Sequence, residues 1–189
     1  MMAEQVSVLI GVPTYRRPQD LRRLLDALPA AVDAALRSGR ATDVEILVVD
    51  NDEEASAREV VEPRGGVRYV VEPRRGVAAV RNRILDEGGA HRIVVFIDDD
   101  ETPGGDDWLV RLLHARERFA AQAVAGPVRT VVDGELDSWI VAGGFYDRAH
   151  RQGLVTGSSI ARAATNNLLI DLPFVRSNGI RVDEAFGRS

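Results

Sequence analysis

A short run of apolar residues, Ile93–Ile97, leads directly into Asp98, Asp99 and Asp100. The run is rich in β-branched residues and does not alternate with polar ones, as expected for a strand buried on both faces of a parallel sheet. Three adjacent carboxylates repel one another, and a cation would offset that repulsion. A hard divalent ion, Mg²⁺ or Mn²⁺, bound by these oxygens and by substrate phosphates, suits such a cluster. The alternative is a solvated acidic turn before Pro103.

Apolar runs alternate with amphipathic segments along most of the chain. We predict strands at residues 6–12, 45–49, 67–71, 93–97, 123–132 and 168–170, and helices at 21–36, 56–61, 76–85 and 108–121. The first strand should stop at Pro13, and Pro29 should kink the first helix or start a second one. Residues 133–162 have weaker patterning and should form loops. The order of the elements predicts an α/β domain with a mostly parallel sheet and helices on both faces.

The composition excludes several classes of chemistry. The chain has no cysteine, so disulfides, zinc–thiolate sites and thiol nucleophiles are ruled out. All 24 basic residues are arginine, which removes mechanisms that need lysine. A formal net charge of −5 gives no electrostatic case for a nucleic-acid partner. No segment approaches the roughly 20 apolar residues of a membrane span, and no signal peptide is evident. We therefore expect a cytoplasmic chain, and peripheral association with the inner face of the membrane stays open.

Charged and polar residues follow three of the predicted strands. The first strand leads into Pro-Thr-Tyr-Arg-Arg at 13–17, the second into Asp-Asn-Asp at 50–52, and the fourth into the three aspartates. These segments should meet, because ligands of open parallel sheets bind outside the carboxyl ends of the strands. Arginines can hold phosphate oxygens in pairs while a metal neutralises the remaining charge. The pattern favours a nucleotide diphosphate with its metal over an ordinary polar sheet edge.

Four segments of the chain resemble the family 2 glycosyltransferases, which have the nucleotide-sugar-binding fold called GT-A. They are VSVLIGVPTYRRP at 6–18, EILVVDND at 45–52, RGVAAVRNRIL at 75–85 and VFIDDDETP at 95–103. Their order and separations match the family over nearly the whole chain. The pattern D-N-D-x-x-x-S-A at 50–57 is most similar to bacterial exopolysaccharide transferases of the succinoglycan-assembly type. The resemblance implies a single GT-A nucleotide-sugar-binding domain over residues 1–189.

The resemblance implies donor-binding roles for residues after the first two strands, namely Pro13, Thr14, Tyr15, Arg16, Asp50, Asn51 and Asp52. The first three would lie along the nucleoside, and the arginine would reach phosphate. The last three would read the base, which is usually uracil in this family. The asparagine is a departure, because the family more often has an acid at that position.

The resemblance also implies roles around the fourth strand. Asp98 and Asp100 would form a D-x-D site for Mg²⁺ or Mn²⁺, with Asp100 as the direct ligand and Asp98 nearer the ribose. Asp99 would face the sugar. Arg81 would lie near the diphosphate or sugar with Asn82 supporting it, although Arg81 as a solvated helix residue is the alternative.

Four further positions match the family more loosely. Gly76 would let the backbone approach the donor closely. Trp108 would lie on the acceptor side, and core packing is its alternative role. Asn166 and Asn167 match polar positions near the donor pocket.

The activity implied by the resemblance is inverting transfer of a sugar from a nucleotide-sugar, with UDP as the expected nucleotide. The acceptor would be a glycan or a lipid-linked saccharide in cell-surface or exopolysaccharide synthesis. A metal would stabilise the leaving phosphate, and a carboxylate would remove the proton of the acceptor hydroxyl. In the family this base belongs to a glycine-rich E-D motif shortly after a segment similar to residues 182–187. We therefore expect the base and the acceptor-binding segment to lie beyond Ser189. A fragment that binds nucleotide and metal without catalysis is the alternative.

Two other enzyme classes fit less well. The spacing Asp98-x-Asp100-x-Thr102 also occurs in haloacid-dehalogenase phosphatases. Those enzymes normally carry the motif on the first strand and need a lysine, which this chain lacks. A dinucleotide dehydrogenase is disfavoured because no G-x-G-x-x-G follows the first strand.

Overall fold

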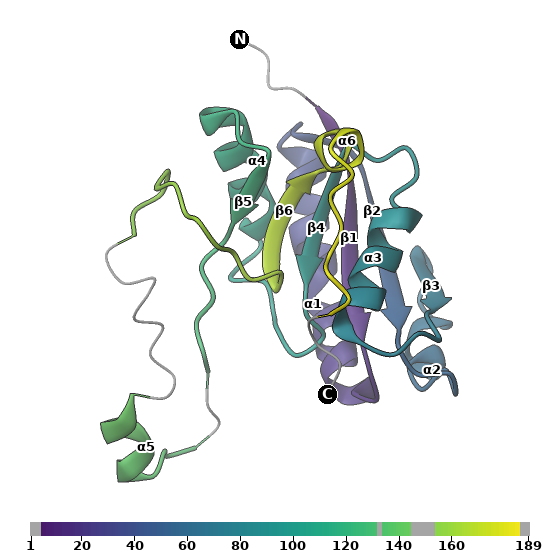
Figure 1. Cartoon of the computed structure of the whole chain (residues 1–189), viewed down its shortest axis with the longest axis vertical. Coiled ribbons are helices and arrows are strands. Elements are labelled where there is room, and N and C mark those ends of the chain that lie inside the picture. Colours follow the sequence, from purple (N-terminus) through teal and green to yellow (C-terminus); the bar gives the residue numbers. More distant parts are fainter. Residues whose placement is uncertain (1–4, 132–133, 145–153, 186–189) are drawn as a thin grey trace.

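The computed structural model describes residues 5–131, 134–144 and 154–185 (Figure 1). Within these ranges the strands are β1 (Val6–Thr14), β2 (Ala41–Asp50), β3 (Val67–Val71), β4 (Ile93–Ile97), β5 (Ala123–Ala125) and β6 (Asn167–Asp171). The helices are α1 (Pro18–Arg37), α2 (Arg58–Val61), α3 (Val77–Glu87), α4 (Trp108–Phe119), α5 (Ser138–Gly143) and α6 (Leu172–Ser177). No helix in the described ranges is both long enough and apolar enough to cross a membrane.

The described strands form one sheet in the order β3-β2-β1-β4-β6-β5. β1 pairs in parallel with β2 and β4, and β2 pairs in parallel with β3. β6 runs antiparallel to both β4 and β5. The prediction of a mostly parallel sheet is therefore confirmed. Since β1 lies between β2 and β4, the carboxyl ends of these parallel strands lie side by side (Figure 1). We call this edge of the sheet, formed by the ends of the strands at Thr14, Asp50 and Ile97 and by the residues that directly follow them, the donor edge.

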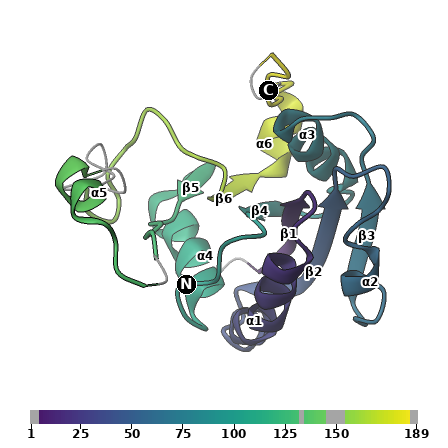
Figure 2. The ribbon, with the colours of Figure 1, turned by 90° about the horizontal axis from the view of Figure 1, so that it is seen from below.

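Helices cover both faces of the sheet, as predicted. Because alternate residues of a strand face opposite sides, Val8, Ile10 and Val12 of β1 pack in one core with α1, α2 and α4. Leu9 packs in the second core with α3 and α6. Figure 2 shows α1 and α4 on one side of the sheet and α3 and α6 on the other. Burial on both sides explains why the Ile93–Ile97 run has no polar alternation.

Gly11 lets α3 approach β1 closely. A Cβ atom at this position would lie 2.3 Å from Cγ2 of Ile84 on α3. We expect Gly11→Ala to lower the free energy of unfolding by about 1–3 kcal/mol, because the core cannot take the extra carbon without moving the helix. Urea unfolding followed by circular dichroism measures the change. Gly65→Ala is the matched control, since nothing lies within 4 Å of its Cβ position. Equal stability of the two variants would contradict this packing.

β1 continues through Pro13, so the prediction that it stops there is wrong. The Thr14 carbonyl accepts a hydrogen bond from the Asn51 N–H at 2.9 Å, which places the side of Pro13 that lacks an N–H toward β4. Pairing between β1 and β4 already ends at Gly11. Pro13 therefore removes no hydrogen bond from the sheet.

The first predicted helix is a single element, α1, that continues through Pro29. Pro29 is exposed, whereas Leu25, Leu28 and Ala31 are buried on the face toward the sheet. Burial of this face on both sides of the proline outweighs the hydrogen bond that the proline removes. No second helix starts at this position.

The region between β5 and β6 differs most from the sequence prediction. β5 ends at Ala125, well before residue 132, because its antiparallel partner β6 begins at Asn167, whose carbonyl accepts the hydrogen bond from the Gly126 N–H at 2.9 Å. The predicted loop at 133–162 contains the short helix α5, which extends away from the sheet (Figure 1). Residues 132–133 and 145–153 of these predicted segments lie outside the described residues.

Candidate donor-binding site

Asp50 ends β2 and is fully buried, with 0% of its surface exposed. Its carboxylate accepts hydrogen bonds from the N–H of Asp52 at 3.0 Å, the N–H of Ala57 at 2.8 Å and the hydroxyl of Tyr69 at 2.8 Å. Burial, and then the hydrogen bond to Asp50, raise the pKa of Tyr69, so this hydroxyl stays protonated. Asp50 thus holds the turn at 52–57 and β3 in place rather than facing a ligand. Tyr69 was not among the predicted site residues, and its only signal in the sequence is its position near the end of a strand.

Asn51 turns its side-chain amide onto the loop at residues 72–76, between β3 and α3. Its Nδ2 donates to the carbonyls of Glu72 at 2.8 Å and Arg74 at 2.7 Å, and its Oδ1 accepts from the N–H of Gly76 at 2.9 Å. Gly76 has φ +120°, a conformation that favours glycine. The amide is therefore largely occupied by backbone groups and keeps one acceptor position, on Oδ1.

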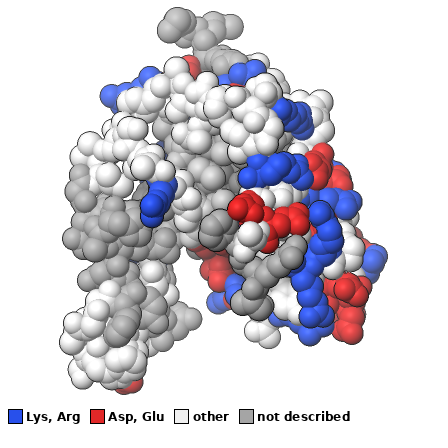
Figure 3. Space-filling model, in the orientation of Figure 1, with Lys and Arg blue, Asp and Glu red and all other residues white. Residues whose placement is uncertain are grey.

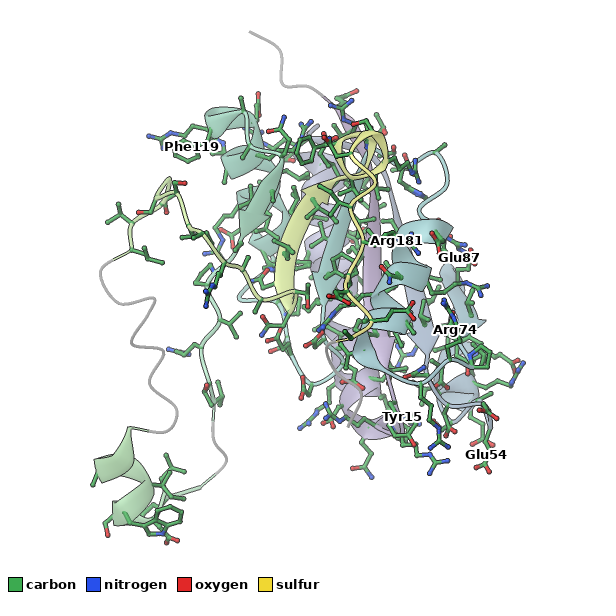
Figure 4. The ribbon with its side chains drawn as sticks, in the orientation of Figure 1. Tyr15, Glu54, Arg74, Glu87, Phe119 and Arg181 are labelled. Carbon is green, nitrogen blue, oxygen red and sulfur yellow. The ribbon has the colours of Figure 1, made fainter. Side chains whose placement is uncertain are left out.

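Asp52 and Arg16 form a two-point ion pair across the ends of β2 and β1. The Nε and Nη2 atoms of Arg16 lie 2.9 and 3.2 Å from the two carboxylate oxygens. This hydrogen bonding lowers the pKa of Asp52 and raises the pKa of Arg16. The Arg16 guanidinium also lies 5.2 Å from the ring centre of Tyr15, which is 44% exposed. Figure 4 shows Tyr15 and Glu54 at the end of the molecule that carries the donor edge.

The alternation of β4 continues into the aspartates, so Asp98 and Asp99 point to opposite sides of the sheet. Asp98 faces α3, where Nη2 of Arg81 lies 3.3 Å from its Oδ1. Asp99 is buried, and its Oδ2 accepts a hydrogen bond from the Thr14 hydroxyl at 2.7 Å. Burial raises the pKa of both carboxyls, against the opposing effects of Arg81 on Asp98 and of Thr14 on Asp99. The expectation that Asp99 faces the sugar does not fit this geometry, because its side chain is buried and its carboxylate is bound by Thr14 and Arg17.

Arg17 joins two of the aspartates; it belongs to the 13–17 segment expected at this edge, but the family resemblance gave it no role of its own. Its Nη1 lies 3.2 Å from Oδ1 of Asp99 and 2.7 Å from Oδ2 of Asp100. The charge of Asp99 is the main cause that raises the pKa of Arg17. The signal for this residue was its place in an Arg-Arg pair directly after the first strand.

The donor set at Asp98 and Asp100 fits a hard divalent cation. Both offer carboxylate oxygens, and Asp100 is half exposed at the surface of the donor edge. In the described part of the chain, no group of three or more His, Asp or Glu side chains is arranged to hold a metal ion. Mg²⁺ is commonly bound by one or two carboxylates that share it with substrate phosphates and water. Two carboxylates are therefore sufficient for a metal that arrives with a diphosphate.

Arg81 and Asn82 follow Gly76 on α3, and the structure gives the two residues separate partners. Arg81 is largely buried and faces Asp98, so it is not a solvated helix residue. Asn82 does not support Arg81. Its amide instead holds the backbone of Val182, with Nδ2 donating to the carbonyl and Oδ1 accepting from the N–H, both at 2.9 Å.

Trp108, at the start of α4, lies close to the two asparagines directly before and at the beginning of β6, Asn166 and Asn167. Trp108 is 5% exposed, and its indole N–H donates to Oδ1 of Asn167 at 3.0 Å. Asn167 in turn donates to the carbonyl of Pro127 at 3.0 Å. Trp108 thus packs in the core, which was the alternative to a place on the acceptor side. Asn166 donates a hydrogen bond from Nδ2 to Oε1 of Glu101, the residue directly after the aspartates, at 2.6 Å.

The arginines of the donor edge are all paired with carboxylates in this structure. Arg16 binds Asp52, Arg17 binds Asp99 and Asp100, and Arg81 binds Asp98; the exposed fractions of the arginine side chains are 52, 51 and 17%. Figure 3 shows that side chains of both signs gather on the side of the molecule with α3 and β3. A diphosphate that arrives with a cation could exchange these partners without leaving a charge uncompensated.

The structure defines a mixed α/β protein with charged and polar side chains gathered at the carboxyl ends of its parallel strands, and comparison with known sequences gives its family. The sequence matches the family model described as "Glycosyl transferase family 2" over residues 9–169. The chain therefore belongs to glycosyltransferase family 2. It is 37% identical over 156 residues to the succinoglycan biosynthesis protein ExoM of Rhizobium meliloti (strain 1021), a match that covers 77% of this chain and 46% of ExoM.

Solved structures show the same fold. TarS 1–349 of S. aureus matches with a TM-score of 0.67 and 15% identity, over 97% of this chain and 52% of the 1–349 chain. The mannosyltransferase PcManGT from Pyrobaculum calidifontis, in complex with GDP-Man and Mn²⁺, matches with a TM-score of 0.64 and 20% identity, over 93% of this chain and 47% of PcManGT. These likenesses confirm the predicted GT-A fold. The chain spans about half the length of these proteins.

Proposed function

We propose that this chain binds a nucleotide-sugar donor, with UDP as the nucleotide, as the donor-binding domain of an inverting glycosyltransferase. The acceptor is a glycan or lipid-linked saccharide, in cell-surface or exopolysaccharide synthesis on the cytoplasmic side of the membrane. The observation that carries the proposal is the convergence of Thr14, Arg17, Arg81 and the three aspartates at one sheet edge, where each of these side chains is within hydrogen-bonding distance of at least one other.

The roles of the edge follow from its charges. Asp98 and Asp100 would hold Mg²⁺ or Mn²⁺, which when bound would stabilise the negative charge on the leaving diphosphate. Arg17 and Arg81 lie beside these carboxylates and can each turn a guanidinium toward phosphate oxygens. Tyr15 offers an exposed aromatic face to the nucleoside. Asp50 and Asp99 are buried and, through their hydrogen bonds, hold in place the segments that carry these groups.

The transfer step also needs a general base for the acceptor hydroxyl. We place that base in a segment following residue 189, in line with the family pattern. The chain spans about half the length of its relatives, which favours a second proposal: residues 1–189 bind donor and metal without completing transfer. Transfer assays on this chain and on a longer form distinguish the two. Equal activity of both forms would contradict our placement of the base.

Isothermal titration with UDP, with and without Mn²⁺, tests the shared part of both proposals. We expect Mn²⁺-dependent binding of UDP and of UDP-sugars, since the metal site is completed by the diphosphate. Binding that is absent, or that is equal with and without the metal, would overturn both proposals.

The geometry of Asn51 favours bases that carry an imino N–H. Both of its amide hydrogens are used by the 72–76 loop, so the side chain can only accept a further hydrogen bond. Uracil has an N–H at N3, whereas cytosine has an acceptor there. We expect UDP to bind about tenfold more tightly than CDP, because two facing acceptors leave one hydrogen bond unmade. Competition between the two nucleotides at saturating Mn²⁺ measures the ratio. Equal affinities would show that Asn51 makes no base contact.

A further inference from the structure

The 72–76 loop, which leads from β3 into α3, is held by the end of β2. The N–H of Glu72 donates to the carbonyl of Asp50 at 2.8 Å, and the Asn51 amide then bonds the loop at three further backbone groups. Two carbonyls lie at one end of the amide and an N–H at the other. This arrangement fixes which end of the side chain is nitrogen. An asparagine matches these three partners, whereas an aspartate has no N–H to offer.

The rest of the loop is consistent with this attachment. Glu72 is buried, and its Oε1 accepts from both the N–H and the Nε of Arg74 at 3.0 Å. The Glu72 carboxylate is thus paired within the loop, by Arg74. The carbonyls of Glu72 and Arg74, in contrast, receive their hydrogen bonds from Asn51. Figure 4 shows Arg74 on the side of the molecule that carries α3 and β3.

The attachment also sets the start of α3. Gly76 is the N-cap residue of α3, and the carbonyl of Gly76 accepts the N–H of Val80 at 3.3 Å. Arg81 is the residue after Val80 on this helix, and its guanidinium reaches Asp98. A movement of Gly76 would therefore move the arginine that faces the first of the three aspartates.

We propose that Asn51 is a positioning residue whose amide fastens the 72–76 loop and the first turn of α3 to the end of β2, and so keeps the donor edge in its binding geometry. Its two N–H donors are essential to this attachment. The role for donor binding rests on the proposed function, whereas the attachment itself can be tested without nucleotide.

Hydrogen exchange on the nucleotide-free chain tests the attachment, with Asn51→Asp as the main variant. This variant keeps an acceptor for the Gly76 N–H but places a carboxylate against two carbonyls. We expect the amides of residues 74–77 to exchange about tenfold faster or more. Asn51→Ala, which introduces no charge, should release the same amides. Asn82→Asp is the matched control, because it makes the same change at an amide that holds Val182, and it should leave residues 74–77 protected.

UDP titration in Mn²⁺ tests the effect on the donor edge. We expect the dissociation constant of the folded Asn51→Asp chain to rise about tenfold. A lower melting temperature with unchanged UDP affinity would assign Asn51 a purely structural role and overturn the positioning proposal. Unchanged exchange at residues 74–77 in both Asn51 variants would overturn the attachment. If the wild-type chain does not bind UDP, the proposed function fails, while the exchange experiment still decides the attachment.

Discussion

Asp100→Ala is expected to remove the Mn²⁺ dependence of UDP binding. Asp100 is half exposed and is the more accessible carboxylate of the predicted metal pair, so its loss should reduce metal affinity without disturbing the core. We expect the Mn²⁺-supported affinity for UDP to fall by about 100-fold or more, because even residues behind a metal ligand contribute about 10–100-fold to metal affinity. The remaining affinity should come from Arg17 and Arg81 and should not respond to Mn²⁺. Titration of UDP at a series of Mn²⁺ concentrations measures both effects.

Asp106→Ala provides the matched control for this experiment. Asp106 is an exposed aspartate in the loop that follows the three aspartates, so the substitution makes the same change in net charge nearby. UDP binding by this variant should retain its Mn²⁺ dependence. A similar loss in both variants would indicate a general electrostatic effect rather than a metal ligand, and full Mn²⁺ dependence in Asp100→Ala would show that the metal is held elsewhere.

The sheet could be predicted from the sequence because each strand carries a strong local signal. The bounds of β3 and β4 agree with the prediction, since both are short runs rich in β-branched residues and bounded by polar residues or glycine. The end of β1 could not be predicted, because the effect of a proline depends on which neighbouring strand its backbone faces. The end of β5 could not be predicted either, because it depends on where its partner β6 begins. Whether Pro13 ends a strand depends on where β4 stops, which only the assembled sheet determines.

The candidate site could be located from the sequence, but the direction of each side chain could not. Strand ends brought Asp50, Asn51 and the three aspartates to one edge, as the topology of a parallel sheet requires. The sequence does not reveal that Asp50 and Asp99 point into the protein, because that depends on Tyr69 and Thr14, which are distant in sequence. For the same reason, the attachment of Asn51 to backbone atoms more than twenty residues away has no sequence signal.

Asp171→Ala should cause the largest loss of stability among the substitutions considered. Asp171 ends β6, accepts the N–H of Phe174 as the N-cap of α6, and lies 3.1 Å from Nη2 of Arg116 and 2.9 Å from Nε of Arg92. The side chains of Asp171 and Arg116 are 7 and 10% exposed. Removing one member of a buried ion pair leaves the other charge poorly solvated, so we expect the free energy of unfolding to fall by about 3–5 kcal/mol. Asp86→Ala breaks the Arg181 pair, which is 46 and 52% exposed, and should cost at most about 1 kcal/mol.

The pH dependence of the unfolding free energy, compared between wild type and Asp171→Asn, separates the charge of Asp171 from its capping role. Burial alone would raise the pKa of Asp171, but the hydrogen bond from Phe174 and the two arginines lower it overall. A carboxyl with a lowered pKa stabilises the folded chain above its ordinary pKa, and this stabilisation is lost as the pH falls through the folded value. The difference in unfolding free energy between wild type and Asp171→Asn, which keeps an acceptor for the cap, should therefore be full at neutral pH and shrink below about pH 4. Urea unfolding from pH 7 to pH 3 measures this difference. A constant difference would mean that shape and capping, rather than charge, account for the role of Asp171.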